Sequence, residues 1–292
     1  MISNTLDFSS SRALDYWELA KPRLVSLSLL SAAVGFFLAT SGPFDFGLFS
    51  VTLFGTALIA ASSMAFNQLL ERHEDAKMRR TASRPLPSGR LQPFEVFIFG
   101  TILAALGLVI LFFAVNRVSA FLAVLTLVTY VLIYTPLKKM TPICTIVGAI
   151  PGALPPLIGW SAAGGRPTLE AWALFAIIFL WQMPHFLAIA WMWRDDYKAA
   201  KFRMLSVEDP DGREVARQIL LYSLALLPVS LVPTFAGLTG PFYFVGSLAL
   251  GLGLVGMAFF GLNRIEQMAR PFFRATIIYL SLLLLLMIFN KV

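Results

Sequence analysis

The sequence contains a single cysteine, Cys144, so no disulfide bond can form within the chain. Charge is also scarce. Only 13% of the 292 residues are charged and 16 are acidic, whereas 58% are hydrophobic. A water-soluble domain could not bury that much apolar surface. The composition therefore excludes an ordinary soluble protein and predicts a chain that crosses a membrane several times.

The N-terminus lacks the charged, apolar and small-residue regions of a signal peptide, and it has no Arg- and Ser-rich transit segment. We therefore expect no removed leader, and a bacterial plasma (inner) membrane rather than a mitochondrial one. Leu14, Trp17 and Leu19 alternate with charged residues. This pattern predicts a short interfacial helix within residues 1–23, on the cytoplasmic side.

Nine apolar runs are long enough to cross a bilayer, which predicts an all-α protein with about nine transmembrane helices in a single domain, 1–292. They cover residues 24–41, 47–70, 94–115, 118–137, 142–161, 168–193, 215–236, 240–262 and 271–290. The fifth run contains Pro151, Pro155 and Pro156. We expect a kink there, with the freed carbonyl groups facing protein or a cavity rather than lipid.

Positive charges are distributed unevenly between the two sides of these spans. Of 23 Lys and Arg residues, 20 fall in the N-terminus and in alternate connections, and only Arg117, Arg166 and Lys291 fall on the other side. This predicts a cytoplasmic N-terminus and an outside C-terminus. It also accounts for the net charge of +7 without a nucleic-acid partner. The polar chemistry lies in two cytoplasmic loops, 71–92 and 194–214.

The first loop begins with Asn67, Glu71 and Asp75, which share one face if the second membrane helix continues through them. Two carboxylates and an amide oxygen suit a hard cation such as Mg²⁺. Basic residues follow at once, among them Lys77, Arg80, Arg84. Acid beside base suits a metal-bridged diphosphate. The alternative is solvated carboxylates beside bases that only set topology.

A second acid-then-base pattern ends the sixth run, where Asp195 and Asp196 are surrounded by Lys and Arg. Its recurrence on the same face, in a chain with 16 acidic residues, favours a functional site over topology alone. The connection between the fourth and fifth runs adds Tyr134, Lys138 and Lys139. These three fit phosphate binding and ordinary topology about equally well.

The chemistry that fits is transfer of a prenyl group. Divalent ions would bridge the carboxylates to a diphosphate, and Lys and Arg would stabilise charge as it leaves. An apolar chamber would protect the allylic cation from water, and the sequence supplies 26 Phe and 6 Trp. His185 lies inside the sixth run. As an ionisable group within a span it is a candidate catalytic residue or haem ligand, or a purely structural residue.

The spacing Asn67-x-x-x-Glu71-x-x-x-Asp75 resembles the first Asp-rich motif of the UbiA-type intramembrane prenyltransferases. Longer stretches resemble the protoheme IX farnesyltransferase (haem O synthase) branch of that family and span most of the chain. They are YWELAKPR at 16–23, ERHEDAKMRRTASRPLPSG at 71–89, YTPLKKMTP at 134–142, GAIPGALPPLIGW at 148–160 and WQMPHFLAIAWMWRDDYKAAKFRML at 181–205. The resemblance implies nine membrane helices and a cytoplasm-facing active site.

The resemblance also implies an activity. The branch transfers farnesyl from farnesyl diphosphate to a vinyl group of haem b, with addition of water, and works with Mg²⁺ in the lipid bilayer. Further implied partners are haem A synthase and terminal-oxidase assembly proteins. The alternatives are a prenyltransferase for a quinone precursor, or a transporter or lipid-binding scaffold. A transporter would show paired broken helices at the midplane, and only the fifth run is strongly broken.

By resemblance, particular residues take on roles. Asn67, Glu71 and Asp75 would hold Mg²⁺, with Asp195 and Asp196 in the second acidic motif. The diphosphate would meet Lys77, Arg80, Arg84 and Lys138. The sequence departs from the family pattern in two places. Glu71 stands for the usual aspartate, a mild change that adds reach. Trp193 and Tyr197 occupy the positions of a D-x-x-x-D motif, which leaves open how a second Mg²⁺ would be held.

Overall fold

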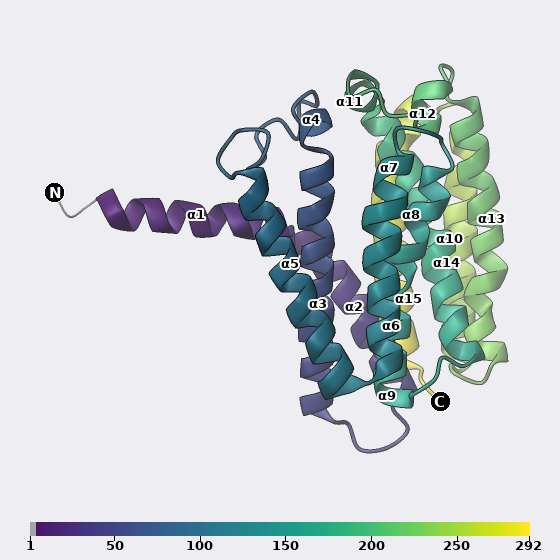
Figure 1. Cartoon of the computed structure of the whole chain (residues 1–292). Helices are drawn as coiled ribbons and strands as arrows, with labels where there is room; N and C mark the ends of the chain where they lie inside the picture. The colour runs from purple at the N-terminus through teal and green to yellow at the C-terminus, as the bar shows by residue number, and fades with distance from the viewer. Residues whose placement is uncertain (1–3) are drawn as a thin grey trace.

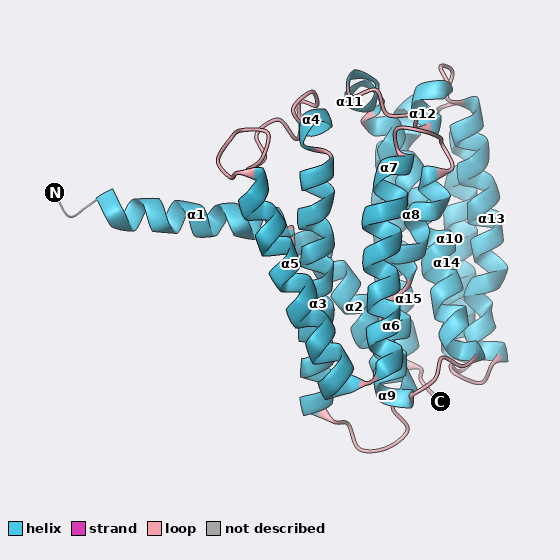
Figure 2. Cartoon of the chain, in the orientation of Figure 1, coloured by secondary structure: helices cyan, strands magenta, loops and turns pink. Residues whose placement is uncertain are grey.

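The computed structural model describes residues 4–292, with side chains described from residue 12 onward. Within that range the fold is a bundle of helices, and the sole β feature is an isolated bridge between Thr239 and Lys291 (Figures 1 and 2). In the described part of the chain, nine helical segments are long and apolar enough to cross a membrane. The predicted all-α fold is confirmed.

The nine spans follow one another along the chain, several of them interrupted. They are α2 (Pro22–Ala39), α3 (Phe46–Leu70), α5 (Pro93–Ile110) with the π-helical η1 (Leu111–Val115), α6 (Arg117–Val128) with η2 (Thr129–Tyr134) and α7 (Thr135–Leu137), α8 (Cys144–Ala153) with α9 (Pro155–Gly164), α10 (Leu169–Met192), α13 (Arg213–Phe235), α14 (Pro241–Gly261) and α15 (Ile265–Phe289).

The ninth span differs from the sequence prediction, because α15 begins at Ile265 and not at 271. Its first turns are amphipathic. Ile265, Ala269 and Phe272 are buried, whereas Arg270 and Arg274 are exposed. Exposed polar side chains lower the mean hydropathy of such a helix without preventing it from packing on one face. A prediction from continuous apolar runs therefore starts the helix too late.

The predicted kink in the fifth span is confirmed. Leu154 separates α8 from α9, and Pro155 and Pro156 occupy the first helical positions of α9, where a missing N–H is tolerated. Residues 155–162 of α9 are buried, so this irregular span is surrounded by protein. Gly159 packs so closely on α2 that a Cβ there would lie 1.8 Å from the carbonyl oxygen of Ala32.

The first helix, α1 (Asn4–Ala20), runs out sideways from the bundle (Figure 1). Its C-terminal end is fastened to the 71–92 loop, because Arg90 pairs with both Asp15 and Glu18. The Gln68 side chain of α3 also donates a hydrogen bond to the carbonyl of Leu19, at 2.7 Å. That α1 lies in a membrane interface stays a prediction.

Three short helices, α4 (Arg72–Asp75), α11 (Arg194–Ala199) and α12 (Leu205–Glu208), sit together at one end of the bundle (Figure 1). They belong to the two long polar loops. The loops 71–92 and 194–214 are therefore on the same face, as the alternating charge pattern predicts.

Candidate active site

The first acidic motif lies where α3 passes into α4. The Glu71 N–H donates to the Asn67 carbonyl at 2.9 Å, and the Asp75 N–H donates to the Glu71 carbonyl at 2.8 Å. The four-residue helical register therefore continues through the break between the two helices. All three side chains are buried. Asn67 also donates from Nδ2 to the hydroxyl of Thr135, at 3.1 Å.

Glu71 is paired with a residue from the connection between the fourth and fifth spans. Lys138 Nζ lies 2.7 Å from Glu71 Oε1 and 4.5 Å from the centre of the Tyr134 ring. Burial alone would lower the pKa of Lys138, but the Glu71 carboxylate outweighs it and the pKa is raised. Lys138 is therefore a fixed positive charge beside the motif.

Lys139 is placed differently from its neighbour. It is exposed, and its Nζ lies 2.8 Å from Glu74 Oε1 at the surface of the loop. Burial of Glu74 opposes ionisation, but the hydrogen bond and charge of Lys139 prevail and lower the pKa of Glu74. Lys139 thus links two loops at the rim of the site, whereas Lys138 lies beside Glu71.

The second acidic motif reaches across to the first loop. Asp196 accepts a hydrogen bond from the Arg79 N–H at 3.3 Å, and Arg80 Nε lies 3.9 Å from its other oxygen. The Arg80 guanidinium lies over the ring of Tyr197, 4.9 Å from its centroid, and over that of Trp193 at 5.6 Å. The two aromatic residues that interrupt the expected acidic spacing therefore hold an arginine over the site.

A cavity of about 360 Å³ opens beside these groups. We call it the loop cavity. It is lined by residues of both polar loops, including Lys77, Arg79, Asp195 and Asp196. Asp195 is exposed, unlike Asp196. The lining of the loop cavity thus joins acids and bases of the two polar loops. It does not include the first-motif residues or their basic partners, which are Asn67, Glu71, Asp75, Arg84 and Lys138.

Lys21 is a member of this site that the sequence analysis missed. It joins α1 to α2 in a left-handed conformation with φ of 48°. Burial, followed by repulsion from Arg84, lowers its pKa to about 7. The opposing attraction of Asp75 and Glu71 places it near the first motif. The available signal was a lysine directly before the proline that starts the first span.

His185 is not among the loop residues. Its Nδ1 lies 2.8 Å from the hydroxyl of Thr276 on α15, and its ring stacks between Trp181, at 4.7 Å, and Phe273, at 4.9 Å. Trp181 in turn donates from Nε1 to the carbonyl of Thr276, at 2.7 Å. His185 therefore lies in the contact between α10 and α15.

The donor set fits a magnesium ion that is shared with a substrate. Among the described residues, no three His, Cys, Asp or Glu side chains are grouped closely enough to hold a metal, so the five predicted ligands do not form one protein cage. Mg²⁺ typically takes one or two carboxylates and completes its shell with waters and substrate phosphates. Glu71 supplies one such carboxylate beside Lys138, whereas both oxygens of Asp75 already accept hydrogen bonds from Arg84 and would have to exchange that partner for the ion. Asp196 Oδ2 is buried and accepts no hydrogen bond, as a metal-facing oxygen would be.

Comparison with known proteins gives the family. The model of the UbiA prenyltransferase family matches residues 28–285. The protoheme IX farnesyltransferase of Solibacter usitatus is 46% identical over 287 residues, which cover 95% of this chain and 98% of that protein.

Two solved structures share the architecture. A structure of digeranylgeranylglyceryl phosphate synthase superposes with a TM-score of 0.81 at 19% identity, over 96% of this chain and 98% of that one. A UbiA homologue from Archaeoglobus fulgidus bound to GPP and Mg²⁺ gives 0.65 at 15% identity, over 94% and 99%. At such identities the likeness concerns the fold. The match of the family model over residues 28–285 and the 46% identity to the Solibacter protein show that the chain belongs to the UbiA prenyltransferase family.

Proposed function

We propose that this protein is a protoheme IX farnesyltransferase. It transfers the farnesyl group of farnesyl diphosphate to a vinyl group of haem b, with addition of water, and releases haem O and diphosphate. The observation that carries the proposal is the near full-length identity of 46% to a protein of that name. The clustered acids and bases at one end of an apolar bundle are the groups this reaction requires.

The basic residues are the proposed diphosphate site. Lys138 and Arg84 are fixed beside Glu71 and Asp75, and Arg80 is held over Tyr197. Preorganised positive charge stabilises a departing diphosphate more in a water-poor site than in water. Lys77 lines the loop cavity, and Lys21 lies near the first acidic motif. Tyr134 packs against Lys138, and Lys139 acts through the rim contact with Glu74.

Asn67, Glu71 and Asp75, with Asp195 and Asp196 opposite, would hold Mg²⁺. Held there, Mg²⁺ would neutralise negative charge on the departing diphosphate. The Archaeoglobus fulgidus homologue bound to GPP and Mg²⁺ supports both a prenyl diphosphate and a divalent ion for this fold.

In the chemical step, the allylic C–O bond of farnesyl diphosphate breaks and its electron pair leaves with the diphosphate. The π-bond of the haem vinyl group attacks the allylic carbon. The resulting cation lies next to the porphyrin ring and is captured by water, which loses a proton. An apolar interior excludes water until that last step. His185, held at Nδ1 by Thr276, keeps its other ring nitrogen for the haem iron or for a proton.

The placement in the cell follows from charge. Lys and Arg residues of both polar loops lie at the α4–α11 end of the bundle, which we assign to the cytoplasmic side of a bacterial inner membrane. The N-terminus would then be cytoplasmic and the C-terminus outside. Haem A synthase and terminal-oxidase assembly proteins are the proposed downstream partners.

The test is a choice of acceptor. Purified protein in lipid nanodiscs is incubated with labelled farnesyl diphosphate and Mg²⁺, and offered haem b or 4-hydroxybenzoate. Label in a haem fraction supports the proposal. Label on 4-hydroxybenzoate alone identifies a quinone-precursor enzyme. Binding of farnesyl diphosphate without turnover on either acceptor indicates a transporter or lipid-binding scaffold.

A further inference from the structure

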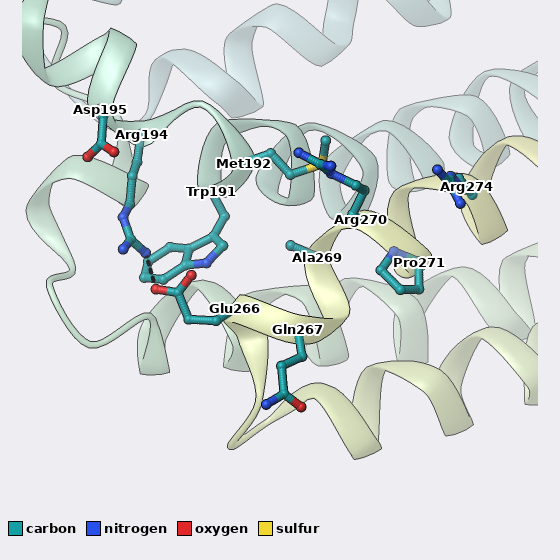
Figure 3. A pocket seen from close by; sticks show the side chains of 10 residues that line it. All are labelled: Trp191, Met192, Arg194, Asp195, Glu266, Gln267, Ala269, Arg270, Pro271 and Arg274. Carbon is teal, nitrogen blue, oxygen red and sulfur yellow. Dashed lines mark hydrogen bonds and ion pairs between the residues drawn. The ribbon is translucent and has the colours of Figure 1, made fainter.

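A second cavity lies next to the loop cavity, between the end of α10 and the first turns of α15. It has a volume of about 500 Å³, and we call it the α10–α15 pocket. Its charged lining residues are Arg194, Asp195, Glu266, Arg270 and Arg274 (Figure 3). None of these except Asp195 belongs to the predicted site. The two cavities share Met192 and Asp195, so a molecule in one adjoins a molecule in the other.

The α10–α15 pocket has paired charges at one end and unpaired arginines at the other. Arg194 Nη1 lies 2.6 Å from Glu266 Oε1, and its guanidinium stacks 4.2 Å above the Trp191 ring. Arg270 and Arg274 have no ion-pair partner among the side chains of residues 12–292, as no pair involving them lies within 4.0 Å. In Figure 3 they extend from α15 on the side of the pocket away from Asp195. One end of the pocket is therefore positive.

Trp191 provides independent evidence for a polar ligand. It lines the α10–α15 pocket and is only 4% exposed, yet its Nε1–H has no hydrogen-bond acceptor. A buried indole N–H usually has a partner, because leaving it unpaired is unfavourable. An acceptor oxygen from a bound molecule would satisfy it. Arg270 and Arg274 lie one helical turn apart without an acidic partner, and the Trp191 Nε1–H has no acceptor. These three donors together suit a ligand with carboxylate groups.

We propose that the α10–α15 pocket binds the carboxylate edge of the acceptor, with Arg270 and Arg274 as the carboxylate-binding pair. This inference rests on the proposed function, in which haem b is the acceptor. Haem b carries two propionate carboxylates on one edge of the macrocycle and a vinyl group on the opposite edge. With the propionates on α15, the body of the macrocycle extends past Met192 toward the loop cavity, where the diphosphate is placed. The pocket thereby sets which edge of the acceptor faces the allylic carbon.

The test compares two changes that remove the same contact. Full-length protein in nanodiscs is titrated with haem b and with haem b dimethyl ester, in which both propionates are esterified, without Mg²⁺ or farnesyl diphosphate. For wild type we expect the ester to bind about 10- to 100-fold more weakly, the range for losing one or two charge-assisted hydrogen bonds. The Arg270→Gln/Arg274→Gln protein should lose that factor for haem b and little more for the ester.

The matched control is Arg264→Gln. Arg264 is exposed at the start of the same helix and does not line the pocket, so its neutralisation makes a similar change in surface charge. We expect wild-type haem affinity from it. The proposal is overturned if the double variant binds haem b as wild type does, or if it loses equal affinity for haem b and ester. It is also overturned if Arg264→Gln matches the double variant, which would indicate a general attraction to anionic lipid or haem.

Failure of the proposed function can be distinguished from failure of the carboxylate-site assignment. If wild type forms no haem O, both proposals fall. If wild type and the double variant form haem O with the same KM for haem b, only the assignment of Arg270 and Arg274 falls.

Discussion

Arg84 donates from Nη1 to both carboxylate oxygens of Asp75, at 2.8 Å each, and the Asp75 side chain has no exposed surface. A buried carboxylate that is held by an arginine is oriented before any ligand arrives. This ion pair joins the end of α4 to the loop that carries the other bases. The acidic and basic halves of the site are therefore one structural unit.

Neutralising Asp75 tests whether the acidic side of the site is needed for activity. We expect Asp75→Asn to lower the rate of haem O formation by about 100-fold or more, comparable to loss of one preorganised stabilising group. Asp211→Asn is the matched control, because Asp211 is exposed in the second polar loop and lies outside both cavities. Initial rates at saturating Mg²⁺ measure both. Near-normal turnover by Asp75→Asn would remove Asp75 from the metal site.

Lys138 and Lys139 are adjacent in sequence but differ in environment. Lys138→Gln removes a buried charge 2.7 Å from Glu71, so we expect the KM for farnesyl diphosphate to rise about 10-fold or more. Lys139→Gln breaks an ion pair of an exposed lysine with the largely buried Glu74, at the rim and away from Glu71, so we expect a smaller change in that KM. Steady-state kinetics on both variants makes the comparison. Equal effects would contradict the distinction that the structure draws between the two lysines.

The low pKa of Lys21 predicts a pH dependence. Its pKa is about 7, against 10.5 for an ordinary lysine, so between these values the unfolded chain binds more protons than the folded one. Lys21 therefore makes the unfolding free energy of the unliganded protein rise with pH across that window. Diphosphate favours the charged amine, so we expect affinity for farnesyl diphosphate to fall as pH rises above 7.

The control for that prediction is Lys21→Arg, which stays charged throughout the range. Binding isotherms between pH 6 and pH 9 should show a flatter dependence for the arginine variant than for wild type. Parallel curves for the two proteins would show that Lys21 does not titrate with the ligand.

His185 has both a ligand role and a structural role open to it. If it binds the haem iron, His185→Ala should shift the absorption spectrum of bound haem and weaken haem binding about 10-fold or more. Thr276→Val removes the hydroxyl beside Nδ1, together with its hydrogen bond to the Phe273 carbonyl, and should give the same spectral change to a smaller extent. Unchanged spectra and affinities, accompanied by lower melting temperatures, would assign His185 to the packing of α10 on α15.

The contact of α9 with α2 predicts a stability effect. At Gly159 a Cβ would lie 1.8 Å from a backbone oxygen of α2, so Gly159→Ala should destabilise the protein by about 3 kcal/mol or prevent folding. At Gly253 nothing lies within 4 Å of the added carbon, so Gly253→Ala should be neutral or slightly stabilising. Thermal unfolding monitored by size-exclusion chromatography measures both. A stable Gly159→Ala protein would contradict the close helix packing.

Much of this architecture could be predicted from the sequence. Apolar runs and Pro155–Pro156 predicted the spans and the kink, because bilayer thickness and a missing N–H act locally. The charge pattern predicted that loops 71–92 and 194–214 share one face. The start of α15 was missed because its amphipathic first turns are not apolar.

The details of the site depended on long-range packing. The proline after Lys21 was a local signal, but the sequence does not indicate that Lys21 lies near Asp75 or Thr135 near Asn67. Lys21, between α1 and α2, and Thr135, in α7, approach these residues only in the folded bundle. Lys138 and Lys139 are indistinguishable by residue type. Arg270 and Arg274 read as topology signals until α15 is placed against α10.

Haem farnesylation is measured by the mass of the haem recovered after incubation of the purified protein with haem b, farnesyl diphosphate and Mg²⁺. We expect a product heavier by one farnesyl and one hydroxyl group, absent when EDTA replaces Mg²⁺. Recovery of unmodified haem b, under conditions in which the protein consumes farnesyl diphosphate with another acceptor, would contradict that expectation.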